Sequence, residues 1–235
     1  MVFLLNIGNT HTQLAEASRG KIDTIVNIPT ADVTADLLPN GVPQAAACVV
    51  PEVRFRLAQH DVFWLEGGIK SEIDLSQCDG AALGADRFAN LIQLGSEYKL
   101  PALCVDFGTA ITYELLDENK VFIGGAIAPG RRLMRNSLNT YTAQLPLVGI
   151  DVPPPKGPGV ATGDQMLLGI DKGAVGGVKE IIEMMRNAVD GDLTVVGAGG
   201  DFKFFKDEIP EMIFGGEDFT LRGILKAWEK NNKCE

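Results

Sequence analysis

Two segments of this chain carry the same residue pattern, although they lie in different halves of the sequence. Residues 4–12 read LLNIGNTHT and residues 104–112 read CVDFGTAIT. Each is an apolar run followed by an amide or acid, a glycine and small hydroxyl residues, which is typical of a strand ending in a tight turn where backbone can approach a phosphate. Two copies predict two related halves whose turns face one nucleotide. The copies differ at an informative position, because Asn6 of the first corresponds to Asp106 of the second.

The order of the apolar runs predicts an α/β fold with mixed sheets, because strands lead each half and helices follow. In the first half we expect strands at residues 2–5, 12–17, 21–28, 44–50 and 62–65, and helices at 30–38, 51–59 and 87–98. In the second half we expect strands at 102–106, 110–117, 120–127 and 193–196, and helices at 131–138, 163–188 and 221–231. We expect an N-terminal half of residues 1–98 and a C-terminal half of residues 99–235.

Charge and composition argue against several classes of function. The formal net charge is −10 and there is no basic stripe, so a nucleic-acid partner is not expected, since phosphate backbones bind clustered Lys and Arg. No apolar stretch reaches the ~18 residues of a membrane span. The four cysteines lack Cys-x-x-Cys spacing and only two histidines are present. A zinc site is therefore not expected, and the thiols fit a reducing, cytoplasmic location.

The two turns supply groups that suit a phosphate. Backbone N–H groups around the glycines and the hydroxyls of the threonines can donate to phosphate oxygens. These groups belong to Gly8, Gly108, Thr10, Thr12 and Thr109. Asp106 can hold a cation that offsets the charge on a transferring phosphoryl group. The alternatives are structural: the first turn read alone is a plain hairpin, and Asp106 is a turn cap.

A third motif, Gly84-Ala85-Asp86-Arg87, comes immediately before an expected helix. An Asp beside an Arg suits a general base with an anion clamp. The carboxylate takes a proton from an attacking hydroxyl, and the guanidinium binds an acidic or carbonyl group of the acceptor. Asp86 is equally suited to be a helix N-cap. The local sequence does not separate these two uses, which are not exclusive.

Three further segments have both structural and ligand-binding interpretations. Thr162 with Gln165 fits a capping box, which leaves a ligand role open. Residues 197–200 follow a strand and are rich in glycine, but they lack the spacing of a dinucleotide-binding loop. Four glycines in the long helical region indicate close helix–helix contact, including contact between subunits. They are Gly169, Gly173, Gly176 and Gly177.

Taken together, these motifs resemble those of the type III pantothenate kinases, a family within the superfamily of acetate and sugar kinases, hexokinase and actin. The resemblance runs from residue 4 to about residue 225. It rests on an ordered set of motifs: residues 6–10, 49–51, 84–90, 106–112, 124–130, 162–169 and 199–200. Each motif alone is weakly specific, whereas the set in this order is specific.

The resemblance implies a fold, an activity and an assembly. The fold would be two ribonuclease-H-like halves, with mixed sheets flanked by helices and a nucleotide cleft between them. The activity would be ATP-dependent phosphorylation of pantothenate, the first step of coenzyme A biosynthesis, with Mg²⁺ and a monovalent cation, usually K⁺. The assembly would be a homodimer with the vitamin site near the subunit interface.

The resemblance also implies roles for individual residues. Asp86 would be the catalytic base, and Asp106 would hold the monovalent cation. The substrate-binding residues would be Gly84, Ala85, Asp86, Arg87 and Thr162. The residues that bind ATP and its phosphates would be Asn6, Gly8, Asn9, Thr10, Thr12, Gln13, Gly108, Thr109, Gly199 and Gly200.

The chain departs from the family pattern at several of these positions. Asn6 replaces the family's first Asp, Gln13 replaces a basic residue, and Gln77 stands where an aromatic substrate contact is common. Ala198 replaces a usual Thr beside the paired glycines. A neutral amide lacks the charge that helps to hold magnesium, although its carbonyl can order a metal-bound water. The alternatives are a catalytically weak or silent relative that binds a ligand or partner, and another small-molecule kinase of the same superfamily.

Overall fold

The computed structural model describes residues 1–80 and 82–232 and contains two five-stranded sheets. The first sheet consists of β1 (Val2–Ile7), β2 (His11–Ser18), β3 (Lys21–Pro29), β4 (Gln44–Cys48) and β5 (Val62–Trp64). The second sheet consists of β6 (Ala102–Phe107), β7 (Ala110–Leu116), β8 (Phe122–Pro129), β9 (Thr194–Ala198) and β10 (Ile213–Phe214).

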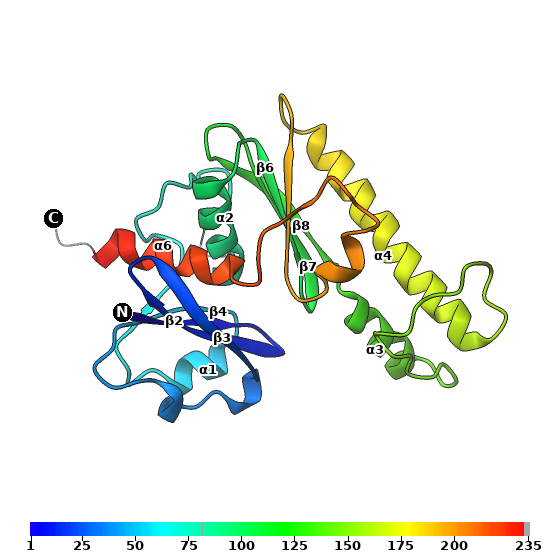
Figure 1. The fold of residues 1–235 in the computed structure, drawn as a ribbon, viewed down its shortest axis with the longest axis horizontal. Coiled ribbons are helices and arrows are strands. Elements are labelled where there is room, and N and C mark those ends of the chain that lie inside the picture. Colours follow the sequence, from blue (N-terminus) through cyan, green and yellow to red (C-terminus); the bar gives the residue numbers. More distant parts are fainter. Residues whose placement is uncertain (81, 233–235) are drawn as a thin grey trace.

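The two sheets have the same topology. The strand order is β3-β2-β1-β4-β5 in the first and β8-β7-β6-β9-β10 in the second. In each half the first three strands pair antiparallel, and the last two join the sheet in parallel. This equivalence confirms the α/β fold class predicted from the order of the apolar runs, with mixed sheets and helices on their faces (Figure 1).

The helices extend the same repeat. Helices α1 (Pro51–Arg56) and α2 (Ala85–Glu97) follow β4 and β5, just as α5 (Phe202–Phe205) and α6 (Phe219–Asn232) follow β9 and β10. Helices α3 (Arg131–Tyr141) and α4 (Thr162–Arg186) are inserted between β8 and β9. Figure 1 shows α4 running along the second sheet and extending beyond it, on the side away from the first sheet.

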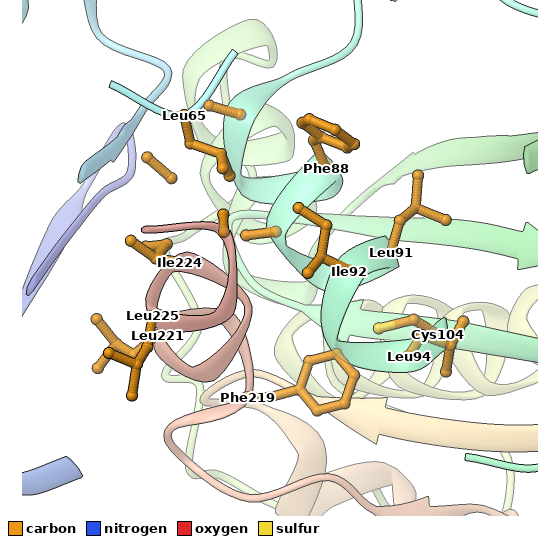
Figure 2. Close-up of a cluster of buried hydrophobic side chains, with 14 of the residues drawn as sticks. Leu65, Phe88, Leu91, Ile92, Leu94, Cys104, Phe219, Leu221, Ile224 and Leu225 are labelled. Carbon is orange, nitrogen blue, oxygen red and sulfur yellow. The ribbon is translucent and has the colours of Figure 1, made fainter. Parts of the chain in front are cut away.

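The central core lies between the two sheets, where α2 packs against α6. Apolar residues recur at helical spacing on α2, including Phe88, Leu91 and Leu94, and they are buried together with Leu221 and Ile224 of α6 (Figure 2). Residues from strands of both sheets complete this cluster. Each such side chain contributes roughly 1.5–3 kcal/mol when fully buried. The central cluster therefore binds the two halves to each other.

The α2–α6 crossing depends on one glycine. A Cβ atom added at Gly223 of α6 would overlap the backbone carbonyl of Ala89 in α2. The two helix backbones approach this closely only because residue 223 has no side chain. The outer faces of the sheets are covered separately, by α1 on the first sheet and by α4 and α5 on the second.

The expected helix at residues 30–38 is wrong. The segment forms two short 3₁₀ turns, Thr30–Asp32 and Ala35–Leu37. Between them Val33 is completely buried and Thr34 is extended, with φ −128° and ψ 166°. The β-branched Val33 and Thr34 favour extended backbone, so the helix does not continue. Thr30, considered as a cap, instead donates its hydroxyl to the carbonyl oxygen of Gly8 at 2.7 Å.

Helix α6 comes from the end of the chain, yet it packs against β1, β4 and α2 of the first half. The division into halves at residues 98 and 99 stays a prediction. A search of the helices in residues 1–80 and 82–232 finds none with the length and apolar character to cross a membrane.

Candidate functional site

The two repeated turns lie face to face. In the first, the Gly8 N–H donates to the His11 carbonyl at 3.1 Å, and in the second, the Gly108 N–H donates to the Ala110 carbonyl at 3.0 Å. The hydroxyl oxygens of Thr10 and Thr109 are hydrogen-bonded to each other at 2.9 Å. Each turn is thus closed by its own backbone bond, and the two turns meet through this side-chain contact.

The exposed part of each turn keeps unused donors. Asn9, Thr10 and Thr109 are exposed, and within the described chain no acceptor takes the backbone N–H of any of them. Successive N–H groups without partners form a concave site for an anion. The N–H groups of Gly8 and Gly108 are used inside the turns, so the expected phosphate donors are the residues that follow each glycine.

Thr12 lies behind the first turn instead of facing its mouth. Its side chain is completely buried, and its hydroxyl is hydrogen-bonded at 3.0 Å to that of Thr30. Thr30 in turn donates to the Gly8 carbonyl. In this structure Thr12 therefore braces the turn, and the proposed role of direct phosphate contact passes to Thr10.

Asn6 and Gln13, the two departures in the first motif, are partners. They face each other across β1 and β2, and Asn6 Nδ2 donates to Gln13 Oε1 at 3.2 Å. Gln13 Nε2 then donates to the Glu217 carbonyl at 3.1 Å. Asn6 Oδ1 is buried and has no hydrogen-bond partner among the described residues. One amide oxygen at the base of the turn is therefore left for a further donor or a cation.

Asp106 is held at the end of β6. Its Oδ2 accepts from Asn90 Nδ2 at 3.1 Å, and Asn90 Oδ1 accepts from the Thr220 hydroxyl at 2.8 Å. Burial raises the pKa of Asp106 to about 6, with the Asn90 bond opposing the rise and the charge of Asp86 adding to it. Asp106 therefore lies within electrostatic range of Asp86, and it is a strand residue bonded from α2, not a turn cap.

The Gly199 backbone lies in close contact with the Asp106 side chain. Gly199 has φ +88°, and a Cβ atom there would overlap Asp106 Oδ1 and lie 2.7 Å from the Phe107 backbone nitrogen. Only glycine adopts this conformation at such close approach without strain. Gly200, by contrast, has open space on its side-chain face. The loop after β9 thus joins the turn after β6 at one edge of the second sheet.

Asp86 is the second residue of α2, so the N-cap interpretation is wrong. The N-cap position is held by Gly84, and no side chain caps this helix end. Asp86 Oδ1 accepts from the Arg87 N–H at 2.8 Å, and a Cβ atom on Gly84 would lie 2.8 Å from the same oxygen. Burial raises the pKa of Asp86, while the Arg87 N–H and guanidinium oppose the rise. A half-buried carboxylate with a raised pKa is a stronger base than an exposed aspartate.

Arg87 is held by Glu114, a residue that the sequence analysis missed. Arg87 Nε donates to Glu114 Oε1 at 2.7 Å, and Glu114 of β7 has no exposed surface. Burial raises the pKa of Glu114 to about 8, with Arg87 opposing the rise. The available signal was a lone acid within the apolar strand AITYELL. Ala85, also expected to contact substrate, is buried in the central core.

Thr162 lies apart from the other candidate residues. It is exposed at the first position of α4, and Figure 1 places that end of α4 on the far side of the second sheet from α2. The expected capping box is wrong, because the N-cap position is Ala161 and no side-chain bond caps the helix. Within one chain, Thr162 and Asp86 are not brought together.

The oxygen atoms of this site suit a hard cation. Asp106 offers a carboxylate and Asn6 offers an unpartnered carbonyl oxygen, and Mg²⁺ prefers oxygen ligands. In the part of the chain that the structure describes, no group of three or more His, Cys, Asp or Glu side chains converges on a point. A divalent ion here would therefore depend on phosphate and water oxygens for most of its coordination.

Comparisons with known proteins settle the family. The model of a family described as type III pantothenate kinase matches residues 2–184, which include both turns and the start of α2. The chain belongs to this family. A type III pantothenate kinase from Rhodospirillum rubrum is 31% identical over 255 residues, covering 98% of this chain and 99% of the relative. A type III pantothenate kinase from Thermosipho melanesiensis is 32% identical over 247 residues, which cover 97% of this chain and 98% of the relative.

Solved structures agree with the fold of this type III pantothenate kinase family member. A Baf family protein from Campylobacter jejuni has a TM-score of 0.66 at 21% identity, covering 97% of this chain and 98% of that one. The activator of 2-hydroxyisocaproyl-CoA dehydratase from Clostridium difficile, solved with bound ADPNP, has a TM-score of 0.56 at 12% identity, covering 100% and 98%. At these identities the likeness concerns the fold alone.

Proposed function

We propose that this protein transfers the γ-phosphoryl group of ATP to the primary hydroxyl of pantothenate, the first step of coenzyme A biosynthesis. Asp86 takes the hydroxyl proton, the freed oxygen forms a bond to the γ-phosphorus, and the bond to the bridging oxygen breaks to release ADP. The observation that supports this most directly is the contact of two phosphate-type turns at Thr10 and Thr109, in a member of a kinase family.

The remaining residues position the reactants. We assign the exposed N–H groups of Asn9, Thr10 and Thr109 to the phosphates, and Gly199 with Gly200 to the nucleoside. Gly84 and Arg87 are assigned to pantothenate, with Glu114 fixing the guanidinium. Holding hydroxyl, base and phosphorus together removes most of the entropy of a bimolecular encounter.

We assign the cations to the oxygen atoms between the turns. Asp106 and the carbonyl of Asn6 would hold Mg²⁺ together with phosphate oxygens, and Asp106 would also be the ligand of a monovalent cation such as K⁺. Bound there, the cations neutralise charge on the transferring phosphoryl group. Glycine at 199 leaves the room beside Asp106 that a larger residue would fill.

An assay of ADP release tests the proposal. The purified protein is supplied with ATP, Mg²⁺, K⁺ and pantothenate, and release is measured with and without the vitamin. We expect turnover that requires pantothenate. Nucleotide binding by calorimetry without pantothenate-dependent ADP release would instead identify a silent relative, and faster turnover with another hydroxylated acceptor would identify a different kinase.

Restoring a carboxylate in the first turn is expected to raise activity. In Asn6→Asp, the free acceptor at position 6 gains a negative charge beside the cation site. We expect the Mg²⁺ concentration for half-maximal rate to fall about tenfold, which corresponds to about 1.4 kcal/mol. The control is Asn6→Ala, which removes the amide oxygen and should raise the Mg²⁺ concentration needed for half-maximal rate. Unchanged magnesium dependence in Asn6→Asp would contradict the placement of position 6.

We propose a homodimer in which Thr162 reaches the vitamin site of the partner. Supporting it, α4 carries exposed glycines, and the α3–α4 region exposes large apolar side chains. Those side chains are Leu133, Tyr141, Leu147, Val152, Val160 and Met184. None of the α4 glycines at 169, 173, 176 and 177 has a neighbour within 4 Å of an added Cβ, so the expected helix contact is not made within one chain.

Mixing two inactive variants tests this arrangement. Asp86→Asn and Thr162→Ala each lose activity alone, but a dimer of one of each contains one site with both native residues. After co-expression, the purified heterodimer is expected to have about half the activity of the native dimer, if the sites act independently. Activity no greater than that of the separate variants would place Thr162 outside the partner's site.

We also propose that the protein acts in the cytoplasm. Cys48, Cys78 and Cys104 are free thiols, and Cys104 is buried. Free thiols persist in the reducing cytoplasm.

A further inference from the structure

Four charged side chains form a network beneath the loop that follows β9. They are Arg131 and Arg135 of α3, Asp171 of α4, and Asp201, which follows Gly200 directly. The side chains of the two arginines are 4% and 1% exposed, and that of Asp171 is 0% exposed. The function proposed above uses none of these four residues.

Arg131 is the centre of the network. Its Nε donates to Asp171 Oδ1 at 2.8 Å, and its Nη1 donates to Asp201 Oδ1 at 2.8 Å. Its Nη2 donates to the Ile150 carbonyl at 3.1 Å, and its guanidinium lies 3.3 Å from the centre of the Phe204 ring. All three nitrogens have acceptors, so the orientation of this guanidinium is fixed.

Asp171 is shared by both arginines. Its Oδ1 accepts from Arg135 Nη2 at 2.7 Å as well as from Arg131, and its Oδ2 has no partner among the described residues. Buried ion pairs are weak contributors to stability, because desolvation offsets their attraction, and apolar replacements are often more stable. A buried network of this kind is therefore better explained by the geometry that it imposes than by the stability that it adds.

Asp201 connects this network to the loop of paired glycines. Its backbone N–H donates to the Phe107 carbonyl at 3.1 Å, and the Phe202 N–H donates to the Gly199 carbonyl at 3.3 Å. Gly199 and Gly200 have no side chains with which to hold themselves in place. The Asp201 carboxylate is thus the first side-chain anchor after the glycines, and its partner Arg131 is itself immobilised in α3.

We propose that Asp201 is a positioning residue for the nucleotide, which acts by tying the Gly199–Gly200 loop to the buried Arg131. This inference rests on the proposed function, in which that loop receives the nucleoside of ATP. A loop already held in its bound conformation loses less conformational freedom when the nucleotide binds, which favours affinity. Pantothenate, held from α2, does not depend on this connection.

Two substitutions at Asp201 test the proposal. Asp201→Ala removes the anchor, and we expect the KM for ATP and the Kd of a non-hydrolysable ATP analogue to rise about tenfold, the loss of one charged hydrogen bond. Asp201→Asn keeps the shape and a neutral acceptor, so a smaller rise, about threefold, is expected. The KM for pantothenate and kcat should stay within about twofold of native, a split that a general loss of structure does not produce.

Glu208→Gln is the matched control. Glu208 pairs with Lys172, the neighbour of Asp171 on α4, at 2.6 Å, but this pair is exposed. An exposed pair contributes little to stability, so this variant should keep native nucleotide affinity and melting temperature. If Asp201→Ala does not fold, the Asp201→Asn measurement decides.

Three results would overturn the positioning role. The first is native affinity for the ATP analogue in the Asp201 variants. The second is an equal rise in the KM for ATP and the KM for pantothenate. The third is a loss of nucleotide affinity in Glu208→Gln as large as that in Asp201→Ala. The wild-type protein separates this failure from failure of the proposed function. If the wild type binds the analogue and phosphorylates pantothenate, and the Asp201 variants have the same affinity and activity, then the positioning role is wrong and the proposed function stands.

Discussion

Asp86→Asn is expected to lower kcat for pantothenate phosphorylation by about a thousandfold, within the range for removal of a general base. The amide has the same shape but cannot accept the hydroxyl proton. The Asp86 Oδ1 bond from the Arg87 N–H can be kept by the amide oxygen, so the start of α2 is preserved. Affinity for the ATP analogue should therefore remain within about twofold of native, because the turns are untouched.

The pH dependence should follow the same carboxylates. Burial raises the pKa of Asp86 and raises that of Asp106 to about 6, so both take up protons at higher pH than an ordinary Asp. A protonated Asp86 cannot act as base, and a protonated Asp106 cannot hold a cation. Activity is therefore expected above the raised pKa of Asp86 and is lost as the pH falls through it, at a higher pH than for an ordinary Asp near 3.9.

Measurement of kcat/KM against pH checks this acid limb. The control variant is Glu52→Gln. It changes an exposed acid in the first turn of α1, the same position that Asp86 has in α2. It should have native kcat and a native pH profile. Full activity in Asp86→Asn, or a wild-type acid limb no higher than the range of an ordinary Asp near 3.9, would remove Asp86 from the role of base.

Gly223→Ala is expected to lower the free energy of unfolding by about 3 kcal/mol, at the upper end for overpacking of a core. The added methyl would overlap the Ala89 carbonyl of α2, and backbone cannot move aside as a flexible side chain does. The helices must therefore separate and loosen the cluster between the two sheets. Urea unfolding followed by circular dichroism measures the change.

Gly95→Ala is the control on the other helix of the pair. A Cβ atom there would lie 2.8 Å from Ile73 Cδ1 and 3.3 Å from Leu116 Cδ1, which are ends of side chains. These can shift, and alanine gains about 1 kcal/mol of helix propensity over glycine. We expect unfolding close to native for Gly95→Ala. Equal losses in the two variants would show that the α2–α6 backbone approach is not what limits the packing.

Much of the fold could be predicted from the sequence, because strands and turns are encoded by short local patterns. The runs around Asn6 and Asp106 alternate with turns in the same order, and strand pairing follows from that order. Helix ends were less accessible. Interpreting Asp86 and Thr162 as N-caps placed the start of each helix too late. The N-cap positions are held by Gly84 and Ala161. A cap residue and a first-turn residue have similar preferences, so composition does not distinguish them.

The contacts that join distant segments were not accessible. Arg131 and Arg135 sit in a strongly polar helix, where charged residues ordinarily face solvent, and no spacing relates them to Asp171 or Asp201. Glu114 looked like an isolated acid until α2 placed Arg87 against it. Such pairings depend on tertiary packing, and a single sequence does not carry that information.

The hydroxyl bond between Thr10 and Thr109 joins the turns of the two sheets, and in the function proposed above it would open when a triphosphate binds between them. Such a bond contributes roughly 0.5–1.5 kcal/mol to stability, so replacing it with another hydrogen bond costs little. In the proposed complex, each hydroxyl would bond to a phosphate oxygen in place of its former partner. In the function proposed above, the nucleotide would bridge the two halves, and the two threonines would meet again once ADP has left.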